Sequence, residues 1–145
     1  MKIGIGSDHG GFELKICLKA MLEENGYQVT DFGPENADSV DYPFYAEKVA
    51  KAVVKGEVER GILICGTGIG MSIAANKISG IRASLIHDSF SAHATREHND
   101  ANVLCLGGRV IGVELAKELT NIWLEAKYQG GRHARRVAQV MELER

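Results

Sequence analysis

Residues 61–70, Gly-Ile-Leu-Ile-Cys-Gly-Thr-Gly-Ile-Gly, carry the clearest indication of how this chain folds. The apolar run at 62–64 predicts a short buried strand, and the pattern of residues 71–77 predicts a helix. Cys65 therefore stands where a strand ends and a glycine-rich turn opens onto a helix N-terminus.

This turn has two chemical properties that could serve a reaction. The first N–H groups of a helix have no partner within it, and the helix dipole favours negative charge there. Such a place stabilises a cysteine thiolate and can also hold an oxyanion. One segment could thus supply a base and stabilise the anion that the base creates. The alternative is structural: a cysteine at a buried strand end often acts as a small hydrophobic residue, and closely spaced glycines can mark a tight turn alone.

Strand and helix patterns alternate on both sides of the turn. Helices are predicted in the intervals, and the predicted strands cover 2–6, 27–32, 61–65, 82–86 and 102–106. This alternation predicts an α/β fold: a three-layer, doubly wound, Rossmann-like, five-stranded parallel sheet with helices on both faces. Residues 1–145 are predicted to form a single domain with a C-terminal helical extension after Gly130-Gly131. Because so short a helix is marginal alone, the segment 129–145 is expected to dock on a neighbouring subunit or on its own domain.

The composition limits the classes of function. A net charge of −2 gives no reason to expect nucleic acid or an anionic membrane as a partner. No apolar run approaches the roughly 20 residues that span a bilayer, and the N-terminus lacks the pattern of a signal peptide. Cys17, Cys65 and Cys105 have neither CxxC spacing nor the pattern of a disulfide framework, so a reduced, cytoplasmic protein is predicted. The histidines lack the spacing of a helical zinc pair, and no metal is expected.

Ligands of parallel sheets bind at the carboxyl ends of the strands, and this rule gathers the first candidate residues. Asp8 and His9 follow the first predicted strand, Cys65 ends the third, and Arg109 follows the fifth. Two of them have structural alternatives, Asp8 as a helix cap and His9 as a loop residue.

Further candidates lie elsewhere in the chain. Arg132 and Arg136 are four apart on the final predicted helix, so one face presents two guanidinium groups; this suits a phosphate, and a solvated basic face is the alternative. His98 and Asn99 end the fourth predicted helix, at the opposite end of the sheet from the glycine turn, and a histidine there also suits a helix C-terminus. Tyr42, in a polar loop predicted over 33–43, could bond a sugar hydroxyl or pack the loop.

Three phosphate- or nucleotide-binding motifs are incomplete. The dinucleotide fingerprint GxGxxG is incomplete at the first strand, where His9 stands at the position of the last glycine. It is incomplete again in the turn after the third strand, where Met71 stands at that position. Met71 also replaces the arginine of a cysteine phosphatase loop, and no Walker A lysine follows the glycines.

The chain resembles the ribose-5-phosphate isomerase B family, which also contains allose-6-phosphate and galactose-6-phosphate isomerases. The resemblance covers nearly the whole chain. It rests on Ser7-Asp8-His9-Gly10-Gly11, Asp41-Tyr42-Pro43, Ile64-Cys65-Gly66-Thr67-Gly68-Ile69-Gly70, Ser72-Ile73-Ala74-Ala75-Asn76-Lys77, Gly80-Ile81-Arg82-Ala83, Arg96-Glu97-His98-Asn99-Asp100-Ala101-Asn102 and Gly130-Gly131-Arg132-His133. Some members carry a glutamate base further along the glycine loop; with Cys65 present, this chain resembles the cysteine type.

The resemblance implies roles for the matched residues. Cys65 is expected to take the C2 proton of the open-chain aldose, and Thr67 to help the proton move between oxygens. Asp8 and His98 are expected to open the sugar ring. The implied substrate-binding residues are the amides of Gly66, Gly68 and Gly70 around the enediolate, Tyr42 and Asn99 at sugar hydroxyls, and His9, Arg109, Arg132 and Arg136 at the phosphate.

The resemblance also implies a homodimer, which in some members pairs again into a tetramer, with each site built from two subunits. His98 and Asn99 can then enter the neighbour's site. The expected substrate is a phosphorylated aldose: the chain is expected to interconvert D-ribose 5-phosphate and D-ribulose 5-phosphate through an enediolate, in the pentose phosphate pathway. No cofactor is expected, because the reaction needs only a base and oxyanion donors. The alternatives are an allose-6-phosphate or galactose-6-phosphate isomerase and, from another class, a non-catalytic nucleotide-binding module.

Overall fold

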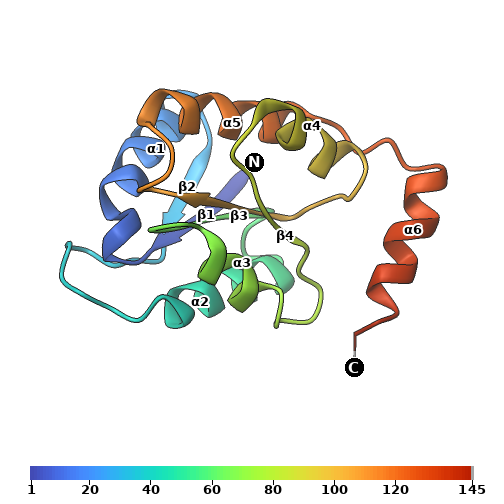
Figure 1. The fold of residues 1–145 in the computed structure, drawn as a ribbon, viewed down its shortest axis with the longest axis horizontal. Helices are drawn as coiled ribbons and strands as arrows, with labels where there is room; N and C mark the ends of the chain where they lie inside the picture. The colour runs from blue at the N-terminus through green and yellow to red at the C-terminus, as the bar shows by residue number, and fades with distance from the viewer. Residues whose placement is uncertain (145) are drawn as a thin grey trace.

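A computed structural model describes residues 1–144, and Figure 1 shows it as a ribbon. Within these residues five strands form one parallel sheet in the order β2-β1-β3-β5-β4. The strands are β1 (Lys2–Ser7), β2 (Gln28–Asp31), β3 (Arg60–Cys65), β4 (Ala83–Leu85) and β5 (Val103–Gly107). Between and after them come the 3-10 turn η1 (His9–Gly11) and the helices α1 (Phe12–Glu24), α2 (Tyr42–Val54), α3 (Ile69–Ala75), α4 (Ser89–Glu97), α5 (Val113–Glu125) and α6 (Arg132–Met141). Each strand lies within one residue of its predicted bounds.

The helices cover both faces of the sheet, as Figure 1 shows, with α1, α4 and α5 on one face and α2 and α3 on the other. Alternate side chains of each strand point to opposite faces, so β3 fills both layers. Ile62 and Ile64 pack in the core beneath α1 and α5, whereas Leu63 and Cys65 pack in the core beneath α2 and α3. The predicted three-layer, Rossmann-like fold is therefore confirmed.

The strand order reverses between β1 and β3, which pair directly. From this pair the sheet grows outward through β2 on one side and through β5 and β4 on the other. The loops that leave β1 and β3 at their carboxyl ends diverge at this point, and such a switch point is where α/β sheets bind ligands. Asp8 follows β1 and Cys65 ends β3, so the topology places both residues there.

The segment after β2 differs slightly from the predicted loop. Tyr42 begins α2 instead of lying in a loop, and Pro43 follows it in the first helical turn. N–H groups in this turn have no partner within the helix, so a proline there costs no hydrogen bond. The start of this segment is anchored by Lys15, whose ammonium group is fully buried and donates to a carboxylate oxygen of Asp31 at 2.8 Å and to the carbonyl of Pro34.

The last helix, α6, stands apart from the body of the molecule in Figure 1. None of its residues, all of which are described, is buried. Its first turn meets the end of α4, where His133 lies against His98. Beyond its last turn, Glu144 accepts hydrogen bonds from the hydroxyl of Ser79 and the N–H of Gly80, each at 2.7 Å. The helix is thus held mainly at its two ends.

No helix among residues 1–144 is both long enough and apolar enough to cross a membrane.

Candidate active site

The glycine turn after β3 is shaped by close packing over β5. Gly68 has a φ of 78°, and a Cβ there would lie 2.5 Å from Leu85 Cδ1 and 2.8 Å from the carbonyl carbon of Leu106. A Cβ on Gly70 would lie 2.6 Å from the ring of Tyr42. Only glycine fits these two positions without displacing its neighbours. The turn can therefore run close to β5 and to Tyr42 while it circles the sulfur of Cys65.

The thiol of Cys65 sits inside this turn. Its side chain is buried, and its Sγ accepts a hydrogen bond from the N–H of Gly68 at 3.1 Å. A donor at this distance stabilises negative charge on sulfur. The hydroxyl oxygen of Thr67 accepts from the N–H of Ile69 at 3.2 Å. Two backbone donors of the turn are thus already used, one by the sulfur and one by Thr67.

Three other amides of the turn remain available. Among residues 1–144, no hydrogen bond is donated by the N–H groups of Gly66, Thr67 or Gly70. The helix that follows, α3, has only seven residues, so its dipole adds little and the individual N–H groups carry the positive potential. An anion formed beside Cys65 could be held by these donors. The predicted oxyanion role fits Gly66 and Gly70, whereas the N–H of Gly68 serves the thiol.

The loop after β1 packs against this turn. The N–H of Asp8 donates to the carbonyl of Ile64 at 3.1 Å, and Oδ1 of Asp8 accepts from the N–H of Gly11 at 3.1 Å. A Cβ on Gly10 would lie 3.1 Å from the backbone nitrogen of Gly66, which shows how closely the two loops approach. Asp8 thus caps η1, the structural alternative from the sequence, and it does so at the edge of the cysteine turn.

Three more candidates surround the same turn. Arg109 reaches over it, since a Cβ on Gly66 would lie 3.2 Å from Nη1 of Arg109. Tyr42 lies against Gly70, as its ring contacts show. His9 follows Asp8 directly, and its Nδ1 accepts from the N–H of Val40 at 3.3 Å. One copy of the chain therefore brings together the cysteine half-site, which consists of Asp8, His9, Tyr42, Cys65, Gly66, Thr67, Gly68, Gly70 and Arg109.

The remaining four candidates lie at the other end of the sheet. The backbone carbonyl of Asn99 accepts from Nε of Arg82, the residue before β4, at 3.2 Å. Three residues later the backbone carbonyl of Asn102 accepts from the N–H of Gly61, at the beginning of β3, at 3.0 Å. The chain that follows α4 is therefore bonded to the amino ends of two strands. His98 and Asn99 do not reach the Cys65 of their own chain, as their position before the fifth strand predicted.

A groove of about 960 Å³ runs between this region and α6. His98 and Asn99 contribute to one wall and Arg136 to the other, together with the apolar side chains of Val137 and Val140. Arg132 lies one turn before Arg136 on the same helix, close enough for its charge to act on His133. These four candidates, His98, Asn99, Arg132 and Arg136, form the histidine half-site.

The sequence interpretation gave no role to His133, although it stands beside Arg132. Its ring stacks on that of His98, with centroids 4.3 Å apart and planes inclined by 9°. Loss of solvent contact and the charges of His98, Arg132 and Arg136 hold the pKa of His133 below its ordinary value. Spacing alone could not reveal this pair, because the two residues belong to different helices.

The other cysteine of the core is chemically different from Cys65. Cys105 is completely buried on β5, and this burial, together with the nearby Cys65, raises the pKa of its thiol. Cys105 therefore stays a neutral thiol and acts as a small apolar side chain. Residues 1–144 contain no group of three His, Cys, Asp or Glu side chains placed to hold a metal ion.

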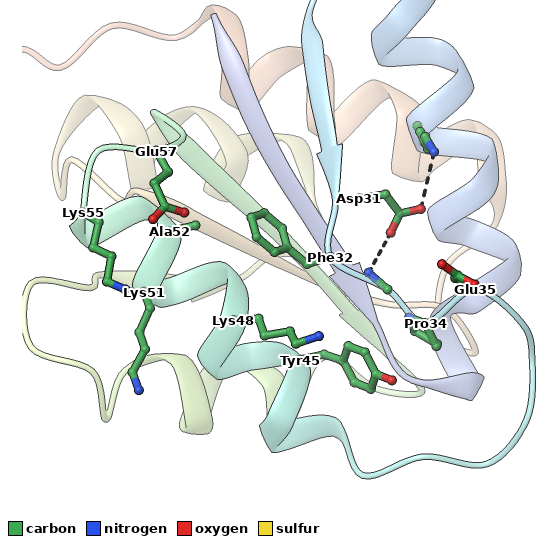
Figure 2. Close-up of a pocket in the computed structure, with 12 residues that line it drawn as sticks. Asp31, Phe32, Pro34, Glu35, Tyr45, Lys48, Lys51, Ala52, Lys55 and Glu57 are labelled. Carbon is green, nitrogen blue, oxygen red and sulfur yellow. Dashed lines mark hydrogen bonds and ion pairs between the residues drawn. The ribbon is translucent and has the colours of Figure 1, made fainter.

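A second cavity, shown in Figure 2, lies beside the edge strand β2. Figure 2 shows Lys48 and Lys51 on α2 and Lys55 just after it, with Asp31 at the end of β2 and Phe32 just beyond. None of the residues that line it belongs to either half-site. Its acidic and basic groups partly pair with each other, as Lys19 and Asp31 do at 3.5 Å.

Comparison with known proteins places these observations in a family. Residues 3–140 match the family model described as Ribose/Galactose Isomerase. The chain is 52% identical over 143 residues to ribose-5-phosphate isomerase B of Escherichia coli, covering 99% of this chain and 96% of that one. It superposes with a TM-score of 0.98 on ribose-5-phosphate isomerase B of Clostridium thermocellum, at 56% identity and with 99% and 97% of the two chains covered. The enzyme of Mycoplasma genitalium, solved with bound ribulose-5-phosphate, matches with a TM-score of 0.94 at 39% identity, with 97% and 94% covered.

Proposed function

The chain belongs to the ribose/galactose isomerase family, and on this premise we propose that it interconverts D-ribose 5-phosphate and D-ribulose 5-phosphate. The observation that carries the proposal is the thiol of Cys65, which accepts from the N–H of Gly68. It is bordered by the amides of Gly66, Thr67 and Gly70, which donate no hydrogen bond within the described residues 1–144. An aldose–ketose isomerase needs a base beside two carbons and donors for the charge that develops on their oxygens. The cysteine half-site offers both.

The proposed reaction begins with ring opening. The proton of the O1 hydroxyl is removed while a proton is delivered to the ring oxygen, the bond from C1 to the ring oxygen breaks, and C1 becomes an aldehyde. No proton is gained or lost overall. We assign these two transfers to Asp8 and His98, one from each half-site. An imidazole has two ring nitrogens that can take and give a proton, which suits this step.

Isomerisation of the open chain follows at the cysteine. The Cys65 thiolate removes the proton from C2, and the electron pair moves into a C1–C2 double bond, so that negative charge develops on O1. The available amides of the turn stabilise this enediolate. Thr67 passes a proton between O2 and O1, and the thiol returns its proton to C1, which completes the ketose. Every proton taken is returned, so the step needs no cofactor.

The phosphate is the part of the substrate that offers binding energy away from the reacting carbons. We assign it to His9 and Arg109 of the cysteine half-site and to Arg132 and Arg136 of the histidine half-site. Guanidinium groups bind phosphate through paired, charge-assisted hydrogen bonds. Tyr42 and Asn99 are assigned to the sugar hydroxyls between the phosphate and the reacting carbons.

A complete site then requires two copies of the chain. We propose a homodimer in which the cysteine half-site of each copy meets the histidine half-site of its neighbour. The separation of the half-sites at opposite ends of one sheet supports this arrangement. Apolar side chains are also exposed beside each: Ile69 and Ile73 at the glycine turn, 51% and 58% exposed, and Leu143 beyond α6, 78% exposed. We further propose a cytoplasmic location, since no disulfide links Cys17, Cys65 and Cys105.

The test is a substrate panel at equal concentrations, with ribose, allose and galactose phosphates and the conversion to ketose as readout. The expected result is a kcat/KM for D-ribose 5-phosphate well above those for the six-carbon substrates. A preference for a six-carbon aldose phosphate would contradict the proposal and indicate an allose-6-phosphate or galactose-6-phosphate isomerase instead. The relatives found do not favour that alternative, nor a non-catalytic nucleotide-binding module.

A further inference from the structure

Arg82 belongs to the segment Gly80-Ile81-Arg82-Ala83, to which the proposed reaction gives no role. It stands directly before β4, and its side chain lines the groove beside α6 while only 21% of it is exposed. A guanidinium group carries five N–H donors in a rigid plane, so it can bind several acceptors at once. The acceptors that surround Arg82 therefore show what it does.

The guanidinium group of Arg82 binds the chain that follows His98. Nε donates to the backbone carbonyls of Asn99 at 3.2 Å and of Asp100 at 3.0 Å. Nη2 donates to the carbonyl of Asp100 at 2.8 Å and to Oδ2 of its carboxylate at 3.3 Å. Two consecutive carbonyls and one carboxylate thus meet a single planar group. One side chain fixes the two peptide units that flank Asp100.

The backbone at Asp100 has a conformation that needs this support. Its φ is 49°, and no other residue among 1–144 except glycine has a positive φ. Left-handed backbone is unfavourable for a residue with a Cβ and persists where the surroundings hold it. Nη1 of the buried Arg96 lies 2.8 Å from Oδ1 of Asp100 and donates to the carbonyl of Ala101 at 2.7 Å. Two arginines therefore clamp the turn directly after Asn99.

We propose that Arg82 is a positioning residue for Asn99: it fixes the backbone from which the Asn99 side chain reaches the sugar. The inference rests on the proposed function, which assigns Asn99 to a sugar hydroxyl. Asn99 is exposed, so its own packing does not hold it in place. A hydrogen bond to a substrate depends on distance and direction, and a displacement of about 1 Å can cost a factor of about a hundred in rate.

The planar shape of the guanidinium group carries this role together with its charge. The ammonium group of a lysine keeps the charge, but it is a single point on a flexible chain and cannot bind both carbonyls and the carboxylate in one plane. Arg82→Lys therefore separates the two contributions. An arginine that acted by charge alone would be replaced by lysine with little loss.

Arg60 provides a matched control for the loss of such a clamp. Its Nη1 donates to the carbonyls of Trp123 and Leu124, each at 3.2 Å, in the last turn of α5. This arginine also binds two consecutive carbonyls, but it belongs to neither half-site and does not line the groove. Arg60→Gln removes a comparable set of bonds without touching the segment at Asn99.

The test measures kcat/KM for D-ribose 5-phosphate in Arg82→Gln, Arg82→Lys and Arg60→Gln. We expect a loss of about tenfold in Arg82→Gln, a loss nearly as large in Arg82→Lys, and the wild-type value in Arg60→Gln. Circular dichroism and urea midpoints show whether each variant is folded. If Arg82→Gln does not fold, the milder Arg82→Lys carries the same test.

Two further measurements separate positioning from direct contact and from general damage. In an Asn99→Ala background, Arg82→Gln should cause no further loss, because a positioning residue acts only through the group that it positions. The inhibition constant of inorganic phosphate should keep its wild-type value in Arg82→Gln, because the phosphate is assigned to other side chains. An Arg82 that itself bound the phosphate would weaken this inhibition.

Several results would overturn the proposal. They are an unchanged kcat/KM in Arg82→Gln, full activity of Arg82→Lys, an equal loss in Arg60→Gln, a further loss in the Asn99→Ala background, or weaker inhibition by phosphate. Wild-type kcat/KM in Asn99→Ala would remove the role of Asn99, and the inference with it. A wild-type protein that does not convert D-ribose 5-phosphate rejects the proposed function itself. An active wild type beside an equally active Arg82→Gln rejects the positioning role alone.

Discussion

Cys65 and His98 lie at opposite ends of the central sheet of one chain. Cys65 ends β3, whereas the chain after His98 is bonded to Gly61 at the beginning of the same strand. The four residue-to-residue steps from Gly61 to Cys65 alone span about 13 Å, at roughly 3.3 Å per step. No side chain crosses that distance through a packed core, which supports the proposal that the two groups act on one sugar from different copies of the chain.

The first prediction concerns the base. Cys65→Ala should lower kcat for D-ribose 5-phosphate by about 10²–10⁴-fold, because no other group in the glycine turn can accept the C2 proton. Ribose 5-phosphate should still bind, since the phosphate contacts remain. A coupled assay and calorimetric binding measure the two effects. Cys17→Ala on α1 is the matched control and should be active; near-normal turnover of Cys65→Ala would remove this thiol from the reaction.

The second prediction concerns the shared site. Cys65→Ala and His98→Ala should each be nearly inactive alone. When the two proteins exchange subunits at random, half of the dimers carry one intact site, so activity should recover to about a quarter of the wild-type value per subunit. Native mass spectrometry of differently tagged chains measures the exchange. Heterodimers without recovered activity would mean that each site is built within one chain.

The third prediction concerns the phosphate. Arg132→Ala or Arg136→Ala should lower kcat/KM for the phosphorylated sugar by about tenfold to a hundredfold, as charge-assisted hydrogen bonds are lost. A sugar without phosphate should be affected much less, because it never used these groups. Arg135→Ala, directed elsewhere on α6, is the control. Equal losses on both sugars would leave Arg132 and Arg136 as structural or interface residues.

The fourth prediction concerns the buried ammonium group of Lys15. Lys15→Met keeps the length of the side chain but leaves the carboxylate of Asp31 and the carbonyl of Pro34 without their buried donor. Removing one partner of a buried pair should lower the free energy of unfolding by about 3 kcal/mol. Urea denaturation at neutral pH measures the loss. Lys51→Met, which breaks an exposed pair with Glu47, should change stability by less than about 1 kcal/mol.

The fifth prediction concerns acid. Burial raises the pKa of Asp31, but the hydrogen bonds from Lys15 and Gly33 and the charges of Lys15 and Lys19 lower it more, so the pKa of this carboxyl lies below its usual 3.8. Its stabilising effect is complete above the unfolded pKa and is lost as the pH falls through the folded one. Asp31→Asn should thus be less stable than wild type at neutral pH, and the difference should shrink between about pH 5 and about pH 3. Urea midpoints across this range measure it; a constant difference would contradict the assignment.

The sequence predicted the parts of this molecule that depend on local pattern. All five predicted strands form within one residue of their expected bounds, and the carboxyl-end rule brought Asp8 and Cys65 together before any coordinates. The parts that it missed depend on contacts across the fold. Lys15 stands on the face of α1 that carries buried leucines, and only the distant Asp31 explains why a lysine is tolerated there. The stack on His98 was equally invisible, since it joins two helices.

The sparse anchoring of α6 has a thermodynamic consequence. An isolated helix of ten residues is marginal in water, and α6 adds no buried residue to compensate. In the homodimer proposed above, its order would be linked by mass action to the neighbour that covers its apolar side chains, among them Val137 and Val140. On dilution, dissociation and the melting of α6 should proceed together, and backbone amides of this helix should exchange with solvent at a rate set by protein concentration. The helix would serve as a built-in reporter of association.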